Sequence, residues 1–400
     1  MMPTALSLDE SPEVEMLLLC ARSHLGGDLA ARIELLLQGD IDWKYVGQKA
    51  HQHNVGPLVY KSLNAVSPEH IPRRVLDQFR KTFLVNVHRT LMLTHELLAV
   101  LDLLENSGIS AIPYKGPALA ASVYGDLTLR QFADLDIMLR KQDVLRARDL
   151  MVSRGYQPQF ELNGIQADAH QRTKYELPLI RNPGRMMVEL KWEVVDKYFS
   201  FPLDPGSLWE RLQPVNLDGK EVLTFSPENT LLILCVHGTK HLWRSLRMIC
   251  DVAELINGCR DLDYDWVLRE AIRLGGKRML FLGLSLAKFL LGTTLPKDMD
   301  RRGEEDPIVE KLARQVKKDL FGEPVGSTNL IEQTFFHLKA RERTRDRIRY
   351  GYGVTMTTTA GDWASFPLPG LLFPLYRFIR PIRLTGKYGG RLLKDFLVQL

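Results

Sequence analysis

The spacing of apolar residues changes twice along this 400-residue chain, and the change restricts the folds that it can adopt. From about Glu13 to Leu104, apolar residues recur every three or four positions, as they do on helices that bury one face. Residues 108–225 instead contain short alternating runs that are typical of strands. The helical spacing returns at Ser226, which is followed by Pro227, a sequence typical of a helix start. We therefore predict an α+β fold, in which a small mixed β-sheet is flanked by helices.

This pattern divides the chain into three regions. We expect an N-terminal helical region at residues 1–107, a mixed α/β core at residues 108–225, and a C-terminal helical region at residues 226–400 that ends in a proline-rich basic tail. ISAIPYKG, after Gly108, is predicted to be a short extended run that enters a sheet. Three further strands are predicted within the core, with the sequences ADLDIMLR, YELPLIRN and MMVELKWEVV. The charged stretch from Pro296 to Pro307 is expected to form a solvated loop.

Composition excludes several classes of protein. Hydrophobic residues make up 45% of the chain and charged residues 25%, values usual for a folded globular protein. The four cysteines lack paired C-x-x-C spacing, so we expect neither a disulfide framework nor a zinc ribbon. The acidic N-terminal segment and the absence of an apolar run of about 18 residues predict a cytoplasmic protein without a membrane span. The net charge of +5 is compatible with a polyanionic ligand but does not require nucleic acid.

Two acidic residues share one face of the first predicted strand. Period-two alternation directs three aliphatic residues to one side and Asp134 and Asp136 to the other. The Cα atoms of this pair are expected to lie about 6.5–7 Å apart. Two ionised carboxylates about 4 Å apart repel each other by roughly 4 kcal/mol at an effective dielectric constant of about 20, which favours a bound cation or a raised pKa. We therefore predict a divalent metal ion here, Mg²⁺ or Mn²⁺.

A third carboxylate is expected from the strand that begins at Met186. Its alternation places Glu189, Lys191 and Glu193 on one face. Mg²⁺ binds one or two carboxylates together with water and substrate phosphates, so Glu189 is expected to join Asp134 and Asp136. In a two-metal site, ions about 3.5–4 Å apart activate the attacking hydroxyl and stabilise the leaving pyrophosphate. The predicted catalytic residues and metal ligands are Asp134, Asp136 and Glu189.

Basic residues near these acids are candidates for binding phosphate. Lys115 and Gly116 stand where a predicted strand turns into a helix, a position at which backbone N–H groups attract anions. Arg130 lies four residues before Asp134 and is expected to clamp a phosphate oxygen if the intervening loop folds toward the carboxylates. The helix that begins at Ser226 offers further polar groups. The predicted substrate-binding residues are Lys115, Gly116, Arg130, Lys191, Lys240 and His241.

An ordered set of motifs identifies a family resemblance. The run YKGPALAASVYGDLTLRQFADLDIML, followed by VELKW and HGTKHLWRSLRMICDV, resembles the signature of the uncharacterised nucleotidyltransferases of the DNA polymerase β-like superfamily. GDW and LYRFIRP near the C-terminus extend the resemblance, which covers about His51 to Tyr388.

The resemblance implies a small mixed sheet with Asp134 and Asp136 as metal ligands and Glu189 as the third acid. It also implies transfer of a nucleoside monophosphate from a Mg²⁺-bound nucleoside triphosphate, such as ATP, to an acceptor hydroxyl. Many superfamily members have Gly-Ser where this chain has Lys115-Gly116, and the subfamily often carries His at the position of Lys191.

Alternative functions stay open at this stage. The altered Lys115-Gly116 region is also compatible with an inactive nucleotide-binding or scaffold protein of the same fold. His237 and His241 are spaced like zinc ligands, but the glutamate of an H-E-x-x-H helix is missing. The tail LLFPLYRFIRPIRL combines basic and apolar residues, as membrane-surface segments do, although its prolines oppose a continuous helix. Protein side chains, sugars, other small molecules and RNA all suit this scaffold as acceptors, and the residue pattern does not choose among them. It does not indicate an oligomeric state either.

Overall fold

The chain folds into a small mixed sheet surrounded by helices, which confirms the predicted α+β class. The structure is a computed structural model and describes residues 11–66, 68–159, 174–181, 186–322, 330–357, 375, 378–383 and 386. Most of the predicted proline-rich tail, including the GDW motif, lies outside the described residues.

One five-stranded sheet forms the centre of the α/β core. Its strands, in spatial order, are β1 Ala111–Pro113, β2 Leu135–Leu139, β5 Met186–Lys191, β4 Glu176–Arg181 and β3 Gln157–Pro158. Only β2 and β5 pair in parallel, and the other neighbours are antiparallel. All residues of β2 are buried, so this strand lies between layers on both of its faces. The parallel pair places the C-terminal ends of β2 and β5 at the same edge of the sheet.

A separate hairpin closes the core before the C-terminal helices begin. It consists of β6 Leu212–Leu217 and β7 Lys220–Phe225, which the sequence analysis did not identify as strands. The hydroxyl of Thr224 donates a hydrogen bond to the carbonyl of Pro113 at 2.7 Å and links β7 to β1. The core also contains shorter elements, namely α6 Gly116–Leu119, the π-helical turn Ala120–Tyr124, the 3₁₀ turns Leu127–Leu129, Lys141–Asp143 and Lys197–Phe199, α7 Val144–Ser153 and α9 Pro205–Glu210.

Helices from both ends of the chain surround the sheet. The N-terminal helices are α1 Pro12–Cys20, α2 Gly27–Leu37, α3 Trp43–Gln52, α4 Gly56–Val66 and α5 Arg73–Asn106, with a 3₁₀ turn at Pro68–His70. The C-terminal helices are α10 Pro227–Lys240, α11 Leu246–Gly258, α12 Tyr264–Leu274, α13 Lys277–Leu291, α14 Lys297–Glu304, α15 Pro307–Phe321, α16 Leu330–Lys339 and α17 Thr344–Met356. The predicted helix start is confirmed, because the Ser226 hydroxyl accepts a hydrogen bond from the backbone N–H of Asn229.

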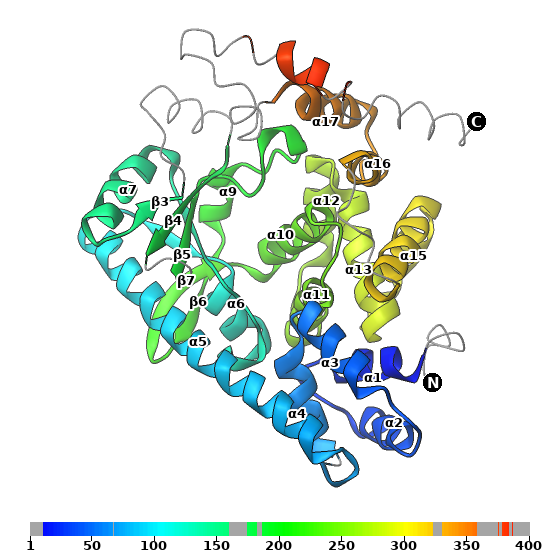
Figure 1. The fold of residues 1–400 in the computed structure, drawn as a ribbon. Coiled ribbons are helices and arrows are strands. Elements are labelled where there is room, and N and C mark those ends of the chain that lie inside the picture. The colour runs from blue at the N-terminus through cyan, green and yellow to red at the C-terminus, as the bar shows by residue number, and fades with distance from the viewer. Residues whose placement is uncertain are drawn as a thin grey trace.

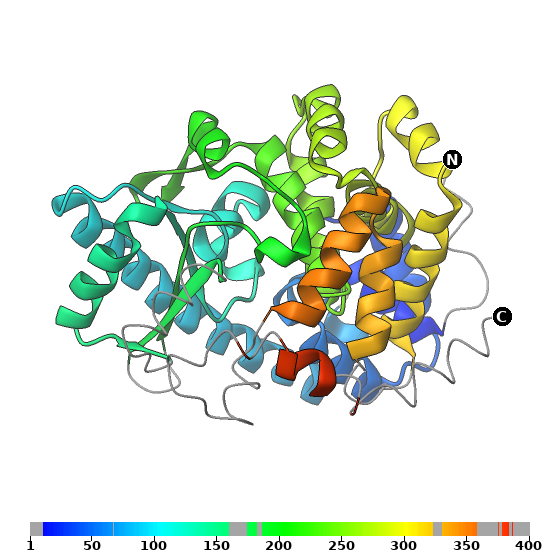
Figure 2. The same ribbon diagram turned by 90° about the horizontal axis from the view of Figure 1, so that it is seen from above.

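The N-terminal and C-terminal helices share one hydrophobic core, although they are far apart in the sequence (Figures 1 and 2). The backbone N–H of Ser23 donates to Glu254 of α11 at 2.7 Å. The hydroxyl of Ser245 donates to the carbonyl of His53 at 2.6 Å. A second core joins the sheet to α5, α7 and the hairpin. The sheet is therefore anchored on one side to a helical body built from both ends of the chain.

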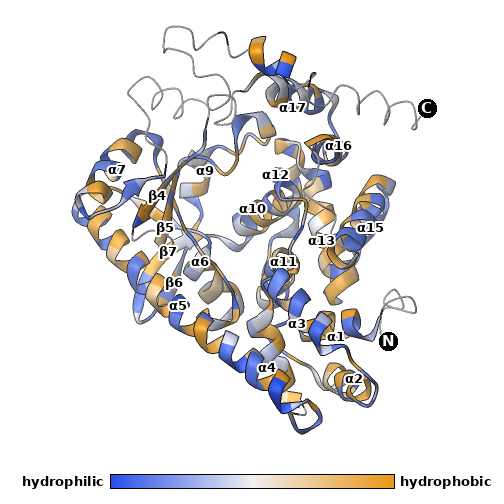
Figure 3. Cartoon of the chain, in the orientation of Figure 1, coloured by the Kyte–Doolittle hydropathy of each residue, from blue (hydrophilic) through white to orange (hydrophobic). Residues whose placement is uncertain are grey.

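Helix α5 connects the two cores. It is 34 residues long and extends from α4 at one end to α7 at the other (Figure 1). Buried Leu93, Leu97, Val100 and Leu104 form an apolar stripe with helical spacing, which packs against the sheet. Apolar and hydrophilic positions accordingly alternate around this helix in Figure 3. Neither α5 nor any other helix in the described part of the chain has the length and apolarity needed to cross a membrane.

Two local predictions were wrong. The stretch from Pro296 to Pro307 contains α14 rather than only a loop, because buried Met299 anchors the turn and Asp298 pairs with Arg301 and Arg302 along the helix. The strand that begins at Met186 ends at Lys191, before the predicted end. The chain bends at residues 192–195 and leaves the sheet, although the alternation of apolar and charged residues continues in the sequence.

Close packing of α10 generates a testable prediction. A Cβ atom added at Gly238 would lie 2.6 Å from three ring carbons of Trp243, which is fully buried. We expect Gly238→Ala to reduce the free energy of unfolding by about 1–3 kcal/mol through overpacking, measured by denaturant titration. Gly47→Ala in α3 is the matched control, because nothing lies within 4 Å of its added Cβ. The control should be neutral or up to about 1 kcal/mol more stable, and equal losses in both variants would contradict this packing.

Candidate active site

The pairing of β2 with β5 brings two of the three predicted acids together. Asp136 and Glu189 are register partners on these parallel neighbours, so their side chains leave the same face of the sheet. Asp136 is 4% exposed, and Glu189 is partly buried. Asp134 lies just before β2 and is half-buried. The parallel register therefore places Glu189 directly beside Asp136, which the sequence pattern alone did not fix.

Lys191 lies at the centre of the acidic cluster. Its Nζ is 3.1 Å from Asp136 Oδ1, 2.7 Å from Glu189 Oε2 and 2.5 Å from Glu176 Oε2. The side chain of Lys191 is only 4% exposed, and its ammonium group also lies 5.0 Å from the ring centre of Tyr175. The ammonium group thus neutralises part of the repulsion among three carboxylates that come from three different strands.

The turn after β1 adds a second ammonium group. Lys115 Nζ lies 3.3 Å from Asp136 Oδ1, and the backbone N–H of Tyr114 donates to the carbonyl of Asp136. Gly116 follows with a φ of +55°, and a Cβ there would lie 3.3 Å from the carbonyl oxygen of Asp134. Glycine suits this position, because L side chains rarely adopt that φ and the turn approaches the next strand closely. The structure therefore places both residues of the predicted Lys115-Gly116 pair against the acids.

Helix α10 borders the same cluster. Lys240 Nζ donates to the hydroxyl of Tyr175 at 2.5 Å and lies 4.2 Å from the centre of that ring. The rings of His237 and His241 are 4.5 Å apart between their centres. Within the described residues, no group of three His, Cys, Asp or Glu side chains is arranged to hold a metal ion. Neither the pair His237 and His241 nor the acids, with their side chains as they stand, therefore forms a metal site.

Burial and charge set the protonation of the cluster. Burial alone would raise the pKa of Asp136, but the ammonium groups of Lys115 and Lys191 outweigh it and hold that pKa below its usual range. Burial would also lower the pKa of Lys191, whereas the surrounding acids raise it well above its usual value. The pKa of Glu189 is raised, mainly by burial. The ammonium group of Lys191 lowers it, but the negative charges of Asp136 and Glu176 oppose that effect. Asp136 and Lys191 are therefore a charged pair at neutral pH.

Arg130 pairs with Asp251 rather than with the acids of the cluster, although it interacts electrostatically with Asp134. Its Nε and Nη2 donate to the two carboxylate oxygens of Asp251 at 2.8 and 2.9 Å, and both side chains are 3% exposed. The hydroxyl of Tyr124 donates to the same carboxylate at 2.8 Å. This bidentate pair ties the loop before β2 to α11. Arg130 fixes the position of that loop in this structure, and its role as a phosphate ligand stays a prediction.

Glu176 and Tyr175 were missed as site residues. The sequence analysis identified the strand that carries Glu176 and named Lys191 as a site residue, but it did not pair the two. A signal was present, because Asn-Pro-Gly at residues 182–184 is typical of a turn between adjacent antiparallel strands. Counting outward from such a turn pairs Glu176 with Lys191, as the observed register does.

The geometry can now be compared with known proteins. A model of the family described as uncharacterised nucleotidyltransferases matches residues 39–292, well over half of the chain. The chain belongs to this family. Family membership confirms the resemblance found from the motifs, and the matched range includes the sheet, the acidic cluster and α10.

The comparisons with solved structures and with curated proteins do not add to this family assignment. The crystal structure of an antigenic nucleotidyltransferase-like protein from Paracoccidioides brasiliensis is similar at 16% sequence identity and a TM-score of 0.32. The similarity covers 53% of this chain and 96% of that one. None of the curated proteins compared matches the chain.

The buried pair between Arg130 and Asp251 can be tested by a double-mutant cycle. We expect Arg130→Met and Asp251→Leu each to lower the free energy of unfolding by about 3–5 kcal/mol. Asp251→Leu removes the bidentate partner of buried Arg130, and Arg130→Met leaves buried Asp251 with the longer ion pair to Arg247 at 3.7 Å. The double variant should lose less than the sum of the two single losses, as measured by denaturant unfolding. Strictly additive losses would show that the two side chains do not stabilise each other.

Proposed function

We propose that this protein is a metal-dependent nucleotidyltransferase that moves a nucleoside monophosphate from a nucleoside triphosphate to an acceptor hydroxyl. The observation that carries the proposal is the register of Asp136 beside Glu189 on parallel strands, in a chain that belongs to a nucleotidyltransferase family. Two carboxylates fixed side by side in a largely buried setting are the ligands that a phosphate-bound divalent ion requires.

The acids supply oxygen donors for such an ion, although no three of the described acidic side chains are arranged around one point as they stand, so their side chains would have to rotate to bind it. Asp134, half-buried beside Asp136, makes no ion pair with any other described residue, and the candidate donors are all carboxylate oxygens. The ammonium groups of Lys115 and Lys191 contact the carboxylates of Asp136, Glu176 and Glu189. Asp134, Asp136 and Glu189 would hold the ion. When bound, a divalent ion polarises the α-phosphate and favours ionisation of the acceptor hydroxyl.

Lys191 favours one resident ion rather than two. Its ammonium group contacts Asp136, Glu189 and Glu176 at the same time, and so supplies the positive charge that a second ion would otherwise contribute. In this proposal Lys191 is a positioning residue, because it keeps Glu189 within reach of Asp136 before any ligand binds.

The remaining lysines would contact the triphosphate. Lys115 is 11% exposed and borders Asp136, so a rotation of its side chain would bring its charge to a phosphate oxygen. Burial lowers the pKa of Lys240 to about 8, only partly opposed by Asp196 and Glu176. An anionic phosphate beside Lys240 would stabilise the charged form of this lysine.

The proposed site predicts the outcome of a binding and transfer experiment. Wild-type protein should be stabilised by one of ATP, GTP, CTP or UTP only when Mg²⁺ is present, by about 2.7 kcal/mol at 100 times Kd. Asp136→Asn should abolish both this thermal shift and nucleotide transfer, whereas Glu221→Gln, an exposed carboxylate on β7, should change neither. Full transfer by Asp136→Asn would rule out this site.

The charge of Lys240 predicts a pH dependence. Below about pH 8 its ammonium form attracts the triphosphate, and above that pH the neutral amine does not. We therefore expect the affinity for the nucleotide to fall by about tenfold, or 1.4 kcal/mol, as the pH rises through this value. Lys240→Arg remains charged and should not show this step in titrations of Kd against pH. The same pH step in the arginine variant would exclude Lys240 as its source.

A second function is favoured by one observation. Lys191 and Lys115 already pair with Asp136, so the acids are neutralised in part without a metal ion. A nucleotide-binding protein without turnover would keep the thermal shift and show no transfer to any acceptor. Transfer that is lost on chelation and in Asp134→Asn would exclude this alternative.

A further inference from the structure

Helices α16 and α17 lie outside residues 39–292, the range that the family model matches. They nevertheless contact two segments that border the acidic cluster. One is the end of α10, which carries Lys240, and the other is the turn Lys197–Phe199, which follows β5. The family match therefore does not account for this pair of helices, and their contacts indicate what they do.

Buried His337 joins α16 to the end of α10. This residue is 2% exposed, and its Nε2 atom lies 3.1 Å from the carbonyl oxygens of both Thr239 and Lys240. Its Nδ1 atom lies 2.7 Å from the hydroxyl of Tyr350 on α17. Burial lowers the pKa of His337 to about 3, so the ring is neutral at neutral pH.

The contacts decide which nitrogen of His337 carries the proton. A carbonyl oxygen only accepts hydrogen bonds, so Nε2 must be the protonated nitrogen that donates to α10. In a neutral ring Nδ1 then has a free lone pair and accepts from the hydroxyl of Tyr350. Both nitrogens of His337 are therefore used, and Tyr350 favours the tautomer that can donate to α10.

The backbone is strained directly after the carbonyls that His337 contacts. Leu242 and Trp243 have φ angles of +57° and +52°, in the left-handed region that large L side chains rarely adopt. Such conformations are costly and persist only where the surrounding contacts hold them. The last carbonyls of a helix also lack partners within that helix. By donating to carbonyls at this point, His337 holds the end of α10 that carries Lys240.

Arg341, between α16 and α17, connects the same helices to the segment after β5. It is fully buried, and its guanidinium group donates to the carbonyls of Phe199 and His337. The hydroxyl of Ser200 donates to the carboxylate of Asp346 on α17 at 3.2 Å. One set of contacts thus holds both the end of α10 and the segment after β5, which keeps the two segments in place relative to each other.

We propose that His337 is a positioning residue for the triphosphate site, and that it acts by holding the backbone at Lys240. This inference rests on the proposed function, in which the ammonium group of Lys240 contacts the triphosphate. The Nζ atom of Lys240 donates to the hydroxyl of Tyr175 at 2.5 Å, so its place at the cluster depends on where α10 ends. If that end shifts, the ammonium group shifts with it, and a phosphate beside it loses a positive charge. The C-terminal helices are in this way coupled to nucleotide affinity through the protein.

The test compares two carboxamide variants of His337 in the full-length chain. His337→Gln places an amide N–H near the position of Nε2, where it can donate to the carbonyls of α10. His337→Asn is one methylene shorter and places its amide near the position of Nδ1, beside Tyr350. The probe is whichever of ATP, GTP, CTP or UTP stabilises the wild type in the presence of Mg²⁺. Its affinity should fall at least about tenfold in His337→Asn and about threefold or less in His337→Gln. Equal affinities in the two variants would overturn the inference.

A double-mutant cycle shows whether His337 acts through Lys240. In a Lys240→Met background, His337→Asn should weaken nucleotide binding by no more than about a further threefold, because the group that it positions is already absent. The same loss of affinity in both backgrounds would show a role in stability alone and would overturn the assignment.

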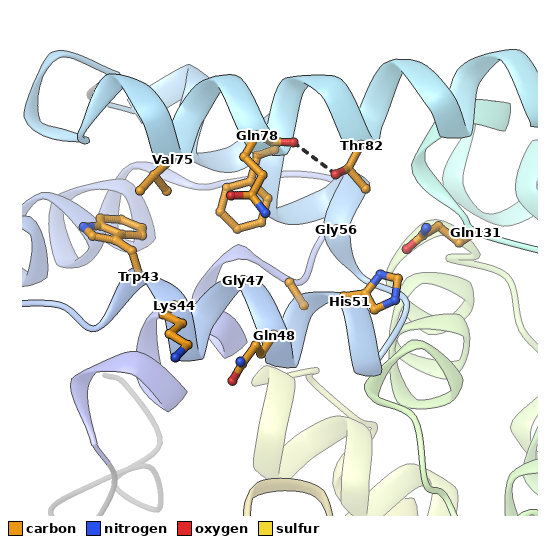
Figure 4. A pocket seen from close by; sticks show the side chains of 12 residues that line it. Trp43, Lys44, Gly47, Gln48, His51, Gly56, Val75, Gln78, Thr82 and Gln131 are labelled. Carbon is orange, nitrogen blue, oxygen red and sulfur yellow. Dashed lines mark hydrogen bonds between the residues drawn. The ribbon is translucent and has the colours of Figure 1, made fainter.

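Ser62→Ala controls for a general loss of stability. The hydroxyl of Ser62 on α4 donates to the carbonyl of Cys20, the last residue of α1, at 3.0 Å, and Ser62 is 2% exposed. This region is remote from α16, because α4 lies among the N-terminal helices, where α3, α4 and α5 line a cleft of about 550 Å³ (Figure 4). The variant also removes a buried donor from the end of a helix, but it should leave the nucleotide affinity unchanged. An equal loss of affinity in Ser62→Ala and His337→Asn would contradict a specific role for His337.

Hydrogen exchange separates this inference from the proposed function. Without nucleotide, the backbone amides of His241, Leu242 and Trp243, which donate to carbonyls of α10, should exchange faster in His337→Asn than in His337→Gln. A Mg²⁺-dependent nucleotide shift in the wild type without this difference in exchange would overturn the positioning role and leave the transferase site intact. The difference in exchange with no nucleotide shift in the wild type would support the hold on α10 and contradict the proposed function.

Discussion

The ammonium group of Lys191 is the contact on which the candidate site depends. It joins Asp136, Glu189 and Glu176, which come from β2, β5 and β4, so one side chain links three strands of the sheet. Removing it would leave three carboxylates close together in a largely buried setting, where uncompensated charge is costly. Lys115 also contacts Asp136, and the ring of Tyr175 lies beside the ammonium group of Lys191.

The helical surround has a clear physical role in this arrangement. Helices from both ends of the chain share one core, and α10 extends from that core to the edge of the acidic cluster. The pair of Arg130 with Asp251 attaches the loop before β2 to α11. The loop that carries Gln131 and Asp134 is therefore held from two sides, by the sheet and by the helical body. This explains how a sheet with short strands can hold charged groups in a fixed register.

The sequence predicted the fold and part of the site from local patterns. The alternation around Asp134 and Asp136, the helix start at Ser226 and the motifs of the family are properties of neighbouring residues, and they identified the elements and the family correctly. Glu176 was missed because its role depends on the register of two strands rather than on its own segment. The helix α14 was missed because Met299 is a single apolar anchor in a charged stretch.

By itself, the sequence determined which residues alternate and where helices begin, because these properties arise within a few residues of the chain. The tertiary structure decided which groups meet across long separations. Arg130 and Asp251 are 121 residues apart, and only the packing of α11 against the loop before β2 joins them. Lys191 lies among the acids for a similar reason, because the sheet order sets β5 between β2 and β4. The turn sequence between β4 and β5 indicates the pairing of those two strands. The parallel pairing of β2 with β5 and the packing of the helices depend on contributions from the whole chain, so no local pattern could specify them.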